Sequence, residues 1–455
     1  MIVSQSQNLY VHKTQLELVQ KLKEMCKIKR KIFKRKKSEF IDENCWRYSE
    51  DYIVFPRFTL LPCEELENRH EHVPREMVFQ GTLIQERRRQ QDASDMVVKQ
   101  LNEIGGAVLC MPPGTGKTTT ACHIMSRMGM ATVVLVHTEE LRQQWLERLG
   151  EYLPQARRAS YTKDLVMDDY DVVVAMLQTM SMKTTERFKK VGMLIVDEAH
   201  HICATTLRLA LDKFNAKYTL GLTATPERKD GRTSYLFWSL GPLAFRLKAS
   251  YQLPITLVTL EIEDRTITKH DGDFVRLSSA LENSTWRTEL VLNEVFAKIP
   301  NISERNILVL GTRNNLVDHA FKHISETLAS KYKLGPVGRL RSGGGQQNQR
   351  AKMESKILVC TDHLVSEGFD VPRLDTLIRL MPTGEAVQTY GRVMRSSSEK
   401  VLPVIVVEVN DTCSSMLGSM FRKRTEILTS GDFTDGEILL CSLGPFLAPS
   451  KKIKV

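Results

Sequence analysis

Residues 107–118 read Ala107-Val-Leu-Cys-Met-Pro-Pro-Gly-Thr-Gly-Lys-Thr118. An apolar stretch of strand character leads directly into a turn with two glycines, and a helical pattern follows, which is the context that a phosphate-binding loop requires. Gly114 and Gly116 allow backbone N–H groups to converge on phosphate oxygens, and the helix N-terminus adds the positive end of its dipole. The stretch therefore predicts a nucleotide site in an α/β domain.

One position departs from the full G-x-x-x-x-G-K-[ST] pattern, because Met111 stands where the pattern has its first glycine. That position lies at the end of the strand and outside the phosphate cradle, so the prediction stands. We expect Lys117 to reach the β- and γ-phosphates and Thr118 to bind Mg²⁺. A glycine-rich turn with an incidental lysine is the alternative for this motif taken alone. The residues expected around the phosphates are Gly114, Thr115, Gly116, Lys117 and Thr118.

A second motif lies about eighty residues further along the chain, where the apolar run 191–196 ends in Asp197-Glu-Ala-His200. A strand that ends in two acids beside a phosphate-binding loop predicts Asp197 on the Mg²⁺ and Glu198 as the group that orients or deprotonates a water. Such an acid favours a hydrolase over a kinase. His200 and His201 suggest a metal site, but no third ligand has a suitable spacing. We assign His200 to coupling.

Short apolar runs alternate with helical patterns along most of the chain, which is typical of parallel sheets with helices on both faces. Two series of strands are expected, so the sequence predicts two doubly wound α/β domains that meet between residues 243 and 281. The first series is 107–110, 132–136, 171–175, 191–196 and 218–222. The second series is 306–310, 356–360, 376–380 and 404–409.

The N-terminal region has a different texture and an excess of basic residues. Residues 1–40 hold eleven basic and three acidic side chains, so they supply most of the net charge of +10. Apolar residues at helical spacing over 16–25 predict an amphipathic helix, and 52–61 has strand character. The dense run 27–37 is consistent with phosphate binding, with a nuclear localisation signal or with a solvated helix face. A small α/β module of about 80 residues is expected.

Composition excludes several classes of protein. With 42% apolar and 26% charged residues the chain has a globular composition, so wholesale disorder is excluded. No unbroken apolar stretch reaches the ~18 to 20 residues of a membrane helix, and the start resembles no signal peptide, so we expect a soluble intracellular protein. Nine scattered cysteines without a C-x-x-C pair suggest neither a disulfide framework nor a zinc ribbon.

The second predicted domain contains a motif that complements the phosphate-binding loop. Gln388-Thr-Tyr-Gly-Arg-Val-Met-Arg395 places Arg392 and Arg395 three residues apart, on one face of a helix. Two such cations directed at a γ-phosphate are expected to act as arginine fingers, a device that raises phosphoryl-transfer rates by about 10³ to 10⁵. Two solvated arginines are the alternative for an isolated motif of this kind.

Together these motifs resemble those of the superfamily 2 DExH helicases, and the resemblance spans roughly residues 83–412. Asp197-Glu-Ala-His200 is similar to the DEAH box, and Gly-Leu-Thr223-Ala-Thr225-Pro is similar to the S/T-A-T element that links ATP state to strand movement. A further similarity is the stretch Cys360-Thr-Asp-His-Leu-Val-Ser-Glu-Gly-Phe-Asp-Val-Pro372. It resembles an element in which a threonine contacts a nucleic-acid phosphate and a glycine and an aspartate approach the nucleotide. The resemblance implies ATP and Mg²⁺ as cofactors.

The resemblance also implies a set of further site residues. Gln90, followed three residues later by Ala93, is similar to the glutamine that reads the adenine edge, although Gln91 fits equally well. The resemblance gives Gly368 and Asp370 a place near the nucleotide. Residues implied in coupling are His200, Thr223, Thr225 and Gln388. Residues implied in contacts to nucleic acid are Thr138, Arg142, Thr179, Thr312, Arg313 and Thr361.

In domain terms the resemblance implies two tandem RecA-like doubly wound domains with a small N-terminal α/β accessory domain. We expect an N-terminal basic accessory domain at 1–82 and a RecA-like ATP-binding domain at 83–250. A linker at 251–285 is expected to lead to a C-terminal RecA-like domain at 286–445.

Within the superfamily, residues 225–231 resemble the XPB-like DNA helicases, with Arg228-Lys229-Asp230 in place of an Arg-Glu-Asp element. The central lysine puts the role of that acid in question. The segment Phe55-Pro-Arg-Phe58 and the layout resemble helicases of large cytoplasmic DNA viruses, including the poxvirus transcript-release helicase. This resemblance implies the nucleus, a cytoplasmic viral factory or the virion as the location.

Three functions follow as hypotheses. The first is an ATP-driven DNA helicase or translocase that acts on single-stranded or duplex DNA. It would act in transcription, viral transcript release included, or in repair or replication. RNA or an RNA–DNA hybrid is a further expected partner, and no membrane partner is expected. The second is a DEAH-type RNA helicase, against which the short sequence after the last predicted strand speaks. The third is a non-hydrolysing scaffold, which predicts a broken ATP site, whereas Lys117, Asp197 and Glu198 are present.

Overall fold

The structure is a computed structural model of the 455-residue chain. It describes all residues except 1, 6–7, 35–36, 60–65, 69–73, 87, 167–168, 183–189, 204–206, 228–229, 248–254, 265–266, 268–272, 367–368, 370, 383–386, 395–399, 401, 430–437 and 448–455. For 2–5, 31–34, 37–38, 66–68, 207–208, 366, 387–388, 392 and 394 it describes the backbone alone. The chain forms two compact units, Met1–Leu247 and Lys248–Val455.

The centre of the first unit is a seven-stranded parallel sheet with the order β10-β11-β9-β12-β13-β8-β14. Its inner strands are buried along their whole length, which is why they read as continuous apolar runs. The strands are β8 (Gly106–Cys110), β9 (Thr132–Val136), β10 (Arg158–Ser160), β11 (Val172–Met176), β12 (Met193–Val196), β13 (Tyr218–Thr223) and β14 (Leu243–Arg246).

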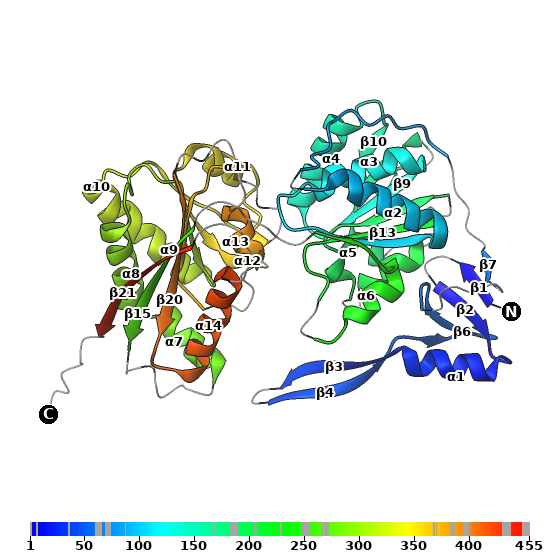
Figure 1. Cartoon of the computed structure of the whole chain (residues 1–455), viewed down its shortest axis with the longest axis horizontal. Helices are drawn as coiled ribbons and strands as arrows, with labels where there is room; N and C mark the ends of the chain where they lie inside the picture. Colours follow the sequence, from blue (N-terminus) through cyan, green and yellow to red (C-terminus); the bar gives the residue numbers. More distant parts are fainter. Residues whose placement is uncertain are drawn as a thin grey trace. The chain divides into compact units, whose positions relative to one another are not determined.

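Helices flank this sheet, and Figure 1 shows them around its strands. They are α2 (Gln90–Ile104), α3 (Lys117–Met128), α4 (Glu139–Tyr152), α5 (Leu177–Ser181) and α6 (Thr233–Leu240), with the short helical segments η3 (Ala199–Cys203) and η4 (Leu207–Lys213). Two hydrophobic clusters result, one on each face of the sheet, because alternate residues of a strand point to opposite faces.

The second unit repeats the architecture with a second seven-stranded parallel sheet of order β17-β18-β16-β19-β20-β15-β21. Its strands are β15 (Ile255–Glu263), β16 (Ile307–Gly311), β17 (Val337–Arg339), β18 (Ile357–Thr361), β19 (Thr376–Arg379), β20 (Val404–Asp411) and β21 (Ile438–Leu447). Its helices are α7 (Phe274–Glu282), α8 (Thr285–Lys298), α9 (Asn314–His323), η6 (Ile324–Leu328), α10 (Ala329–Lys331), α11 (Gly345–Glu354), α12 (Asp362–Ser366), α13 (Val387–Met394) and α14 (Ser415–Thr429).

The predicted fold class is confirmed, since two parallel sheets flanked by helices are those of tandem RecA-like domains. All nine predicted strands are present within a residue or two. The sequence missed β10, β14, β15, β17 and β21. Of these, β15 lies within 251–285, where a linker was expected, and it pairs with β20 over eight residues. Its buried and partly exposed residues alternate, so it lacks the continuous apolar run by which the other strands were found.

The N-terminal module forms a five-stranded sheet, β5-β6-β2-β1-β7, beside one helix, α1 (Leu16–Met25). The sheet strands are β1 (Ile2–Gln5), β2 (Asn8–His12), β5 (Arg47–Tyr48), β6 (Tyr52–Pro56) and β7 (Leu66–Asn68). The basic run that follows α1 is strand β3 (Lys27–Lys34), paired with β4 (Lys37–Asn44) as a two-stranded ribbon (Figure 1). The interpretation of this run as a solvated helix face is therefore wrong, because the helix ends at Met25.

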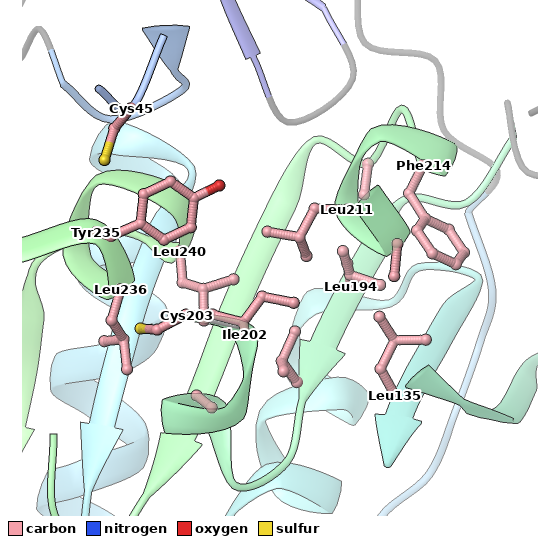
Figure 2. Close-up of a cluster of buried hydrophobic side chains, with 14 of the residues drawn as sticks. Cys45, Leu135, Leu194, Ile202, Cys203, Leu211, Phe214, Tyr235, Leu236 and Leu240 are labelled. Carbon is pink, nitrogen blue, oxygen red and sulfur yellow. The ribbon is translucent and has the colours of Figure 1, made fainter. Parts of the chain in front are cut away.

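This module is docked on the first sheet through the segment that follows β6. Arg57 is buried and donates from Nη1 to the carbonyl oxygen of Ala216 at 2.8 Å and from Nη2 to that of Lys217 at 2.7 Å. The ring of Phe58 covers Gly106, where an added Cβ would lie 2.3 Å from a ring carbon. Figure 2 shows Cys45 of the module on the hydrophobic cluster that contains Tyr235 of α6.

In the part of the chain that the structure describes, no helix has both the length and the apolar character needed to cross a bilayer. Among the described cysteines only Cys441 is exposed, and none forms a disulfide.

Replacing Arg57 with Ala is expected to destabilise the first unit by roughly 2 kcal/mol, because the buried carbonyl oxygen of Ala216 and the partly buried one of Lys217 lose their donor. The measurement is the midpoint of thermal unfolding, with limited proteolysis of the N-terminal module as a second readout. Arg47→Ala is the matched control, since Arg47 is about half exposed and its ion pair with Asp212 contributes little. Equal midpoints for the two variants would contradict the assigned role of Arg57.

Candidate active site

The predicted phosphate-binding loop joins β8 to α3 in the first unit. Gly114 and Gly116 have φ values of +76° and +91°, a left-handed conformation that glycine adopts without strain. Gly116 is the N-cap of α3, and the Nζ of Lys117 donates to the carbonyl oxygen of Met111 at 3.1 Å. Thr115 donates to the carbonyl oxygen of Pro112 at 2.6 Å. Left-handed glycines at a helix N-terminus form the nest that phosphate oxygens occupy.

The structure separates the two glutamines between which the sequence left a choice. Gln90 is buried, accepts from the backbone N–H of Ile84 at 2.8 Å and donates from Nε2 to the carbonyl oxygen of Thr115 at 2.8 Å. A Cβ at Gly116 would lie 2.1 Å from the same Nε2. Gln91 is exposed, and its amide donates to Asp95 instead. Gln90 is therefore the glutamine in contact with the phosphate-binding loop.

Asp197 lies immediately after β12 and is 6% exposed. Its Oδ2 accepts from the indole N–H of Trp145 at 2.7 Å, and its Oδ1 accepts from the backbone N–H of Glu198 at 2.9 Å. Burial raises the pKa of Asp197, with the charge of Glu198 adding to the effect, while Trp145 and Lys117 oppose it. The indole donor holds the carboxylate in one orientation, and each oxygen keeps a second lone pair for a cation.

A series of contacts leads from Glu198 to the Thr223-Ala-Thr225 element. Glu198 is buried and has a φ of +45°, a conformation that is strained for a residue with a side chain and that is concentrated at functional sites. The Nδ1 of His200 lies 3.6 Å from Glu198 Oε2 and 3.4 Å from Thr223 Oγ1. Thr223 Oγ1 also accepts from the backbone N–H of Thr225 at 3.2 Å. One imidazole therefore contacts both predicted motifs.

A stack of three imidazoles lies beside this series. The rings of His200 and His201 are 4.3 Å apart, and those of His201 and His137 are 4.0 Å apart. Among the described residues no group of three or more His, Cys, Asp or Glu side chains has the arrangement of a metal site. The stack packs the 197–201 segment against the end of β9.

Three residues expected on nucleic acid lie near the ends of the first sheet. Thr138 is the N-cap of α4, where its Oγ1 accepts from the backbone N–H of Leu141 at 3.3 Å. Arg142, one turn later, donates to Ser160 and to Glu139. Thr179 lies in α5, after β11.

Three further residues of this kind lie in the second unit. Glu282, at the end of α7, accepts from Thr312 Oγ1 at 2.5 Å and pairs with Arg313 Nε at 3.0 Å. One carboxylate therefore holds both side chains, although the side chain of Arg313 remains 59% exposed. Thr361 is the last residue of β18, directly before Asp362 of α12.

Helix α13, which carries the predicted arginine motif, is held by a buried network that the sequence did not indicate. The hydroxyl of Tyr390 donates to Glu408 Oε1 at 2.6 Å, and Arg424 Nε donates to Glu408 Oε2 at 2.8 Å. Arg379 lies 3.2 Å from Glu408 Oε1 and 3.4 Å from Asp362 Oδ1. Burial raises the pKa of Tyr390 well above its usual range, so this hydroxyl stays protonated and donates.

Several predicted residues cannot be placed at the level of side chains. Gly368, Asp370 and Arg395 lie outside the described residues. Gln388 and Arg392 lie in α13, where the structure describes their backbone alone.

Trp145 and Glu408 are the most informative residues that the sequence analysis missed. Trp145 lies in the same helix as Arg142, and nothing in its spacing links it to a carboxylate 52 positions away. Glu408 is an acid inside the apolar strand β20, and a fully buried acid needs a partner. That signal was available and could have prompted a search for buried arginines.

The sequence is similar to one protein family and to several known proteins. Residues 83–228 match the family ResIII, the Type III restriction enzyme, res subunit. The protein "Putative ATP-dependent RNA helicase L396" of Acanthamoeba polyphaga mimivirus is 27% identical over 361 residues, 76% of this chain and 68% of that protein. The protein "DNA 3'-5' translocase XPB2" of Sulfurisphaera tokodaii is 30% identical over 178 residues, 36% of this chain and 39% of that protein.

Among solved structures, S. cerevisiae Dbp5 bound to RNA and ADP BeF3 superposes with a TM-score of 0.53 at 14% identity, over 78% of this chain and 89% of that chain. The chain is similar to superfamily 2 helicases. It is an ATP-dependent helicase, and the first unit carries the predicted phosphate-binding loop.

Gly116→Ala is expected to abolish nucleotide binding by the helicase, because the new Cβ would meet Gln90 and the φ of +91° is strained for alanine. The measurement is the affinity for a fluorescent ATP analogue. Gly418→Ala in α14 is the control, because its Cβ would come no closer than 3.6 Å to a neighbouring side-chain atom. Wild-type affinity in the Gly116 variant would show that the loop does not bind phosphate as built.

Tyr390→Phe is expected to lower kcat for ATP several-fold with a smaller change in KM, because α13 loses its hydrogen bond to Glu408. The stability cost of one hydrogen bond is about 1 kcal/mol, so the variant should fold. Tyr332→Phe, the same change at a partly buried position of the same unit, is the control. An unchanged kcat in the Tyr390 variant would leave the network a purely structural role.

Proposed function

We propose that this helicase is an ATP-driven DNA translocase in which ATP turnover is coupled to contacts with the nucleic-acid backbone. The observation that carries the proposal is the series Glu198, His200, Thr223 and Thr225, in which one imidazole lies within 3.6 Å of the water-activating acid and within 3.4 Å of the coupling element. A movement of Glu198 or of Thr223 must therefore move or break the contacts that His200 makes with both.

The residues of the first unit fit an ATP–Mg²⁺ complex. The left-handed glycines at 114 and 116 lie at the N-terminus of α3, a geometry that fits phosphate groups, and a Cβ at Gly116 would meet Gln90. Thr118 at the start of α3 and Asp197 after β12 would hold Mg²⁺, which would supply positive charge to stabilise the phosphate groups. Glu198 takes the role of orienting the attacking water.

The second unit has the complementary roles in the proposal. The proposal assigns Arg392 and Arg395 to the γ-phosphate, Gly368 and Asp370 to the nucleotide, and Gln388 to coupling. Thr312, Arg313 and Thr361 bind phosphates of the strand from the second unit. The side chains of the first unit assigned to the strand are Thr138, Arg142 and Thr179.

The choice of DNA rests on the stretch of 178 residues at 30% identity to a protein named as a DNA translocase. RNA is the second candidate, because a viral relative that matches over more of the chain is named as an RNA helicase. A role in transcription, repair or replication follows from the DNA assignment, and viral transcript release is the narrower form suggested by the layout.

Steady-state ATPase at low salt tests the proposal, without nucleic acid and then with single-stranded DNA, duplex DNA and RNA of matched length. We expect DNA to stimulate turnover more than RNA, and Glu198→Gln to abolish turnover in every condition. His200→Ala is expected to keep basal turnover and lose most of the stimulation, because it removes the link and not the water-activating acid.

Stimulation by RNA alone would transfer the assignment to an RNA helicase. If no polymer stimulated the wild-type enzyme, coupling would be absent and the proposal would fail. Full stimulation of the His200 variant would refute the route through the imidazole while leaving the DNA assignment in place.

A further inference from the structure

The β3–β4 ribbon of the N-terminal module is not used by the ATP site, and its composition is unusual for a free-standing pair of strands. Residues 27–37 contain eight Lys or Arg and no Asp or Glu. The two strands pair only with each other, as a sheet of two. A two-stranded ribbon by itself is marginally stable, so this pair depends on the acids Glu39, Asp42 and Glu43 of β4 opposite the basic strand and on packing at its base.

At the base of the ribbon one face is exposed, whereas the other packs on the rest of the first unit through Ile28 and Glu43. Along β3 the exposure alternates, with Lys27 and Lys29 exposed and Ile28 buried in the hydrophobic cluster of the first unit. On the opposite strand Phe40 is 65% exposed, two positions from Asp42, which pairs with Lys29. Because alternate residues share a face, the outer face presents Lys27, Lys29 and the ring of Phe40, together with Asp42 opposite Lys29, and Lys27 also pairs with Glu24 at 2.5 Å.

The base of the ribbon is fixed to the loop that follows the Thr223-Ala-Thr225 element. Arg232 donates to Glu43 Oε2 of β4 from Nη2 at 2.7 Å and from Nε at 3.0 Å, and the pair is largely buried. Gly231, at a φ of +82°, packs so closely that a Cβ there would lie 2.4 Å from the carbonyl oxygen of Lys29. The ribbon therefore contacts the chain six to seven residues after Thr225, which belongs to the His200 series.

We propose that the β3–β4 ribbon is a second nucleic-acid contact of this helicase, which binds duplex DNA through its basic outer face and transmits that contact through the Glu43–Arg232 pair. The proposal rests on the proposed function, in which DNA is the track. Phosphate neutralisation by the exposed Lys27 and Lys29, which phosphates contact in competition with Glu24 and Asp42, supplies the charge complementarity.

Groove dimensions favour duplex DNA as the partner. The major groove of B-form DNA is about 12 Å wide and admits a two-stranded β-ribbon. The major groove of A-form RNA is deep and too narrow for side-chain access, so a ribbon of this kind cannot bind in that groove.

The first test is the salt dependence of duplex-DNA binding by the full chain with Lys27 and Lys29 both changed to Ala. Each lost phosphate contact makes the negative slope of log K for duplex binding against log salt concentration shallower by about 0.9. We therefore expect the slope of the double variant to be shallower by up to ~2, with basal ATPase activity unchanged. Lys13→Ala with Lys21→Ala is the matched control, because it removes the same charge from exposed positions of the same module. Equal slopes for the two double variants would overturn the proposal.

The second test concerns transmission. Glu43→Gln keeps the size of the side chain and removes its charge, so duplex binding should persist while stimulation of ATPase by duplex DNA falls several-fold. Stimulation by single-stranded DNA should be retained, which separates this variant from a damaged ATP site. Full stimulation by duplex DNA in Glu43→Gln would refute transmission through the pair.

Duplex RNA of matched length is the remaining arm. If the double variant of Lys27 and Lys29 showed the same change in salt dependence with duplex RNA as with duplex DNA, the assignment of the ribbon to a DNA groove would be overturned. The two proposals fail differently: a wild-type enzyme that no DNA stimulates contradicts the proposed function, whereas normal wild-type stimulation with an unaffected ribbon variant contradicts only the second contact.

Discussion

The parallel pairing of β8, β12 and β13 is the constraint on which the rest of the active site depends. Val196 is in register with Gly221, and Thr223 with Cys110, so the residues after these three strands emerge at one edge of the sheet. That edge brings together the phosphate-binding loop, Asp197 with Glu198, and Thr223, which are far apart in the sequence. Because the strands are buried on both faces, a shift in register would expose apolar side chains or bury loops.

Both units hold functional elements with buried charge and local strain, which are unfavourable for folding. In the first unit Asp197 is buried against Trp145 and Glu198 adopts a left-handed φ. In the second unit Glu408 is buried with Arg379, Arg424 and the hydroxyl of Tyr390. Such groups persist only where the surrounding hydrogen bonds fix them, and these hydrogen bonds restrict each group to one geometry.

Contacts within the first unit connect its chemistry to its surface. His200 lies between Glu198 and Thr223, and the chain after Thr225 leads to Arg232, which pairs with Glu43 of the ribbon. The N-terminal module is docked independently by Arg57 and by a shared hydrophobic cluster. The base of the ribbon is thus held by its own ion pair, in addition to the contacts that dock the rest of the module.

The sequence by itself determined the strands with continuous apolar runs, the phosphate-binding loop and the acidic pair, because each depends on residues that are adjacent in the chain. Only the tertiary structure shows that Gln90, and not Gln91, contacts the predicted phosphate-binding loop, since that contact is to the backbone of Thr115. Only the structure showed that the basic run is a strand and that Trp145 and Glu408 hold the site, because their partners are distant in sequence. Local patterns encode periodicity, whereas the pairing of buried polar groups is fixed by how sheets and helices pack.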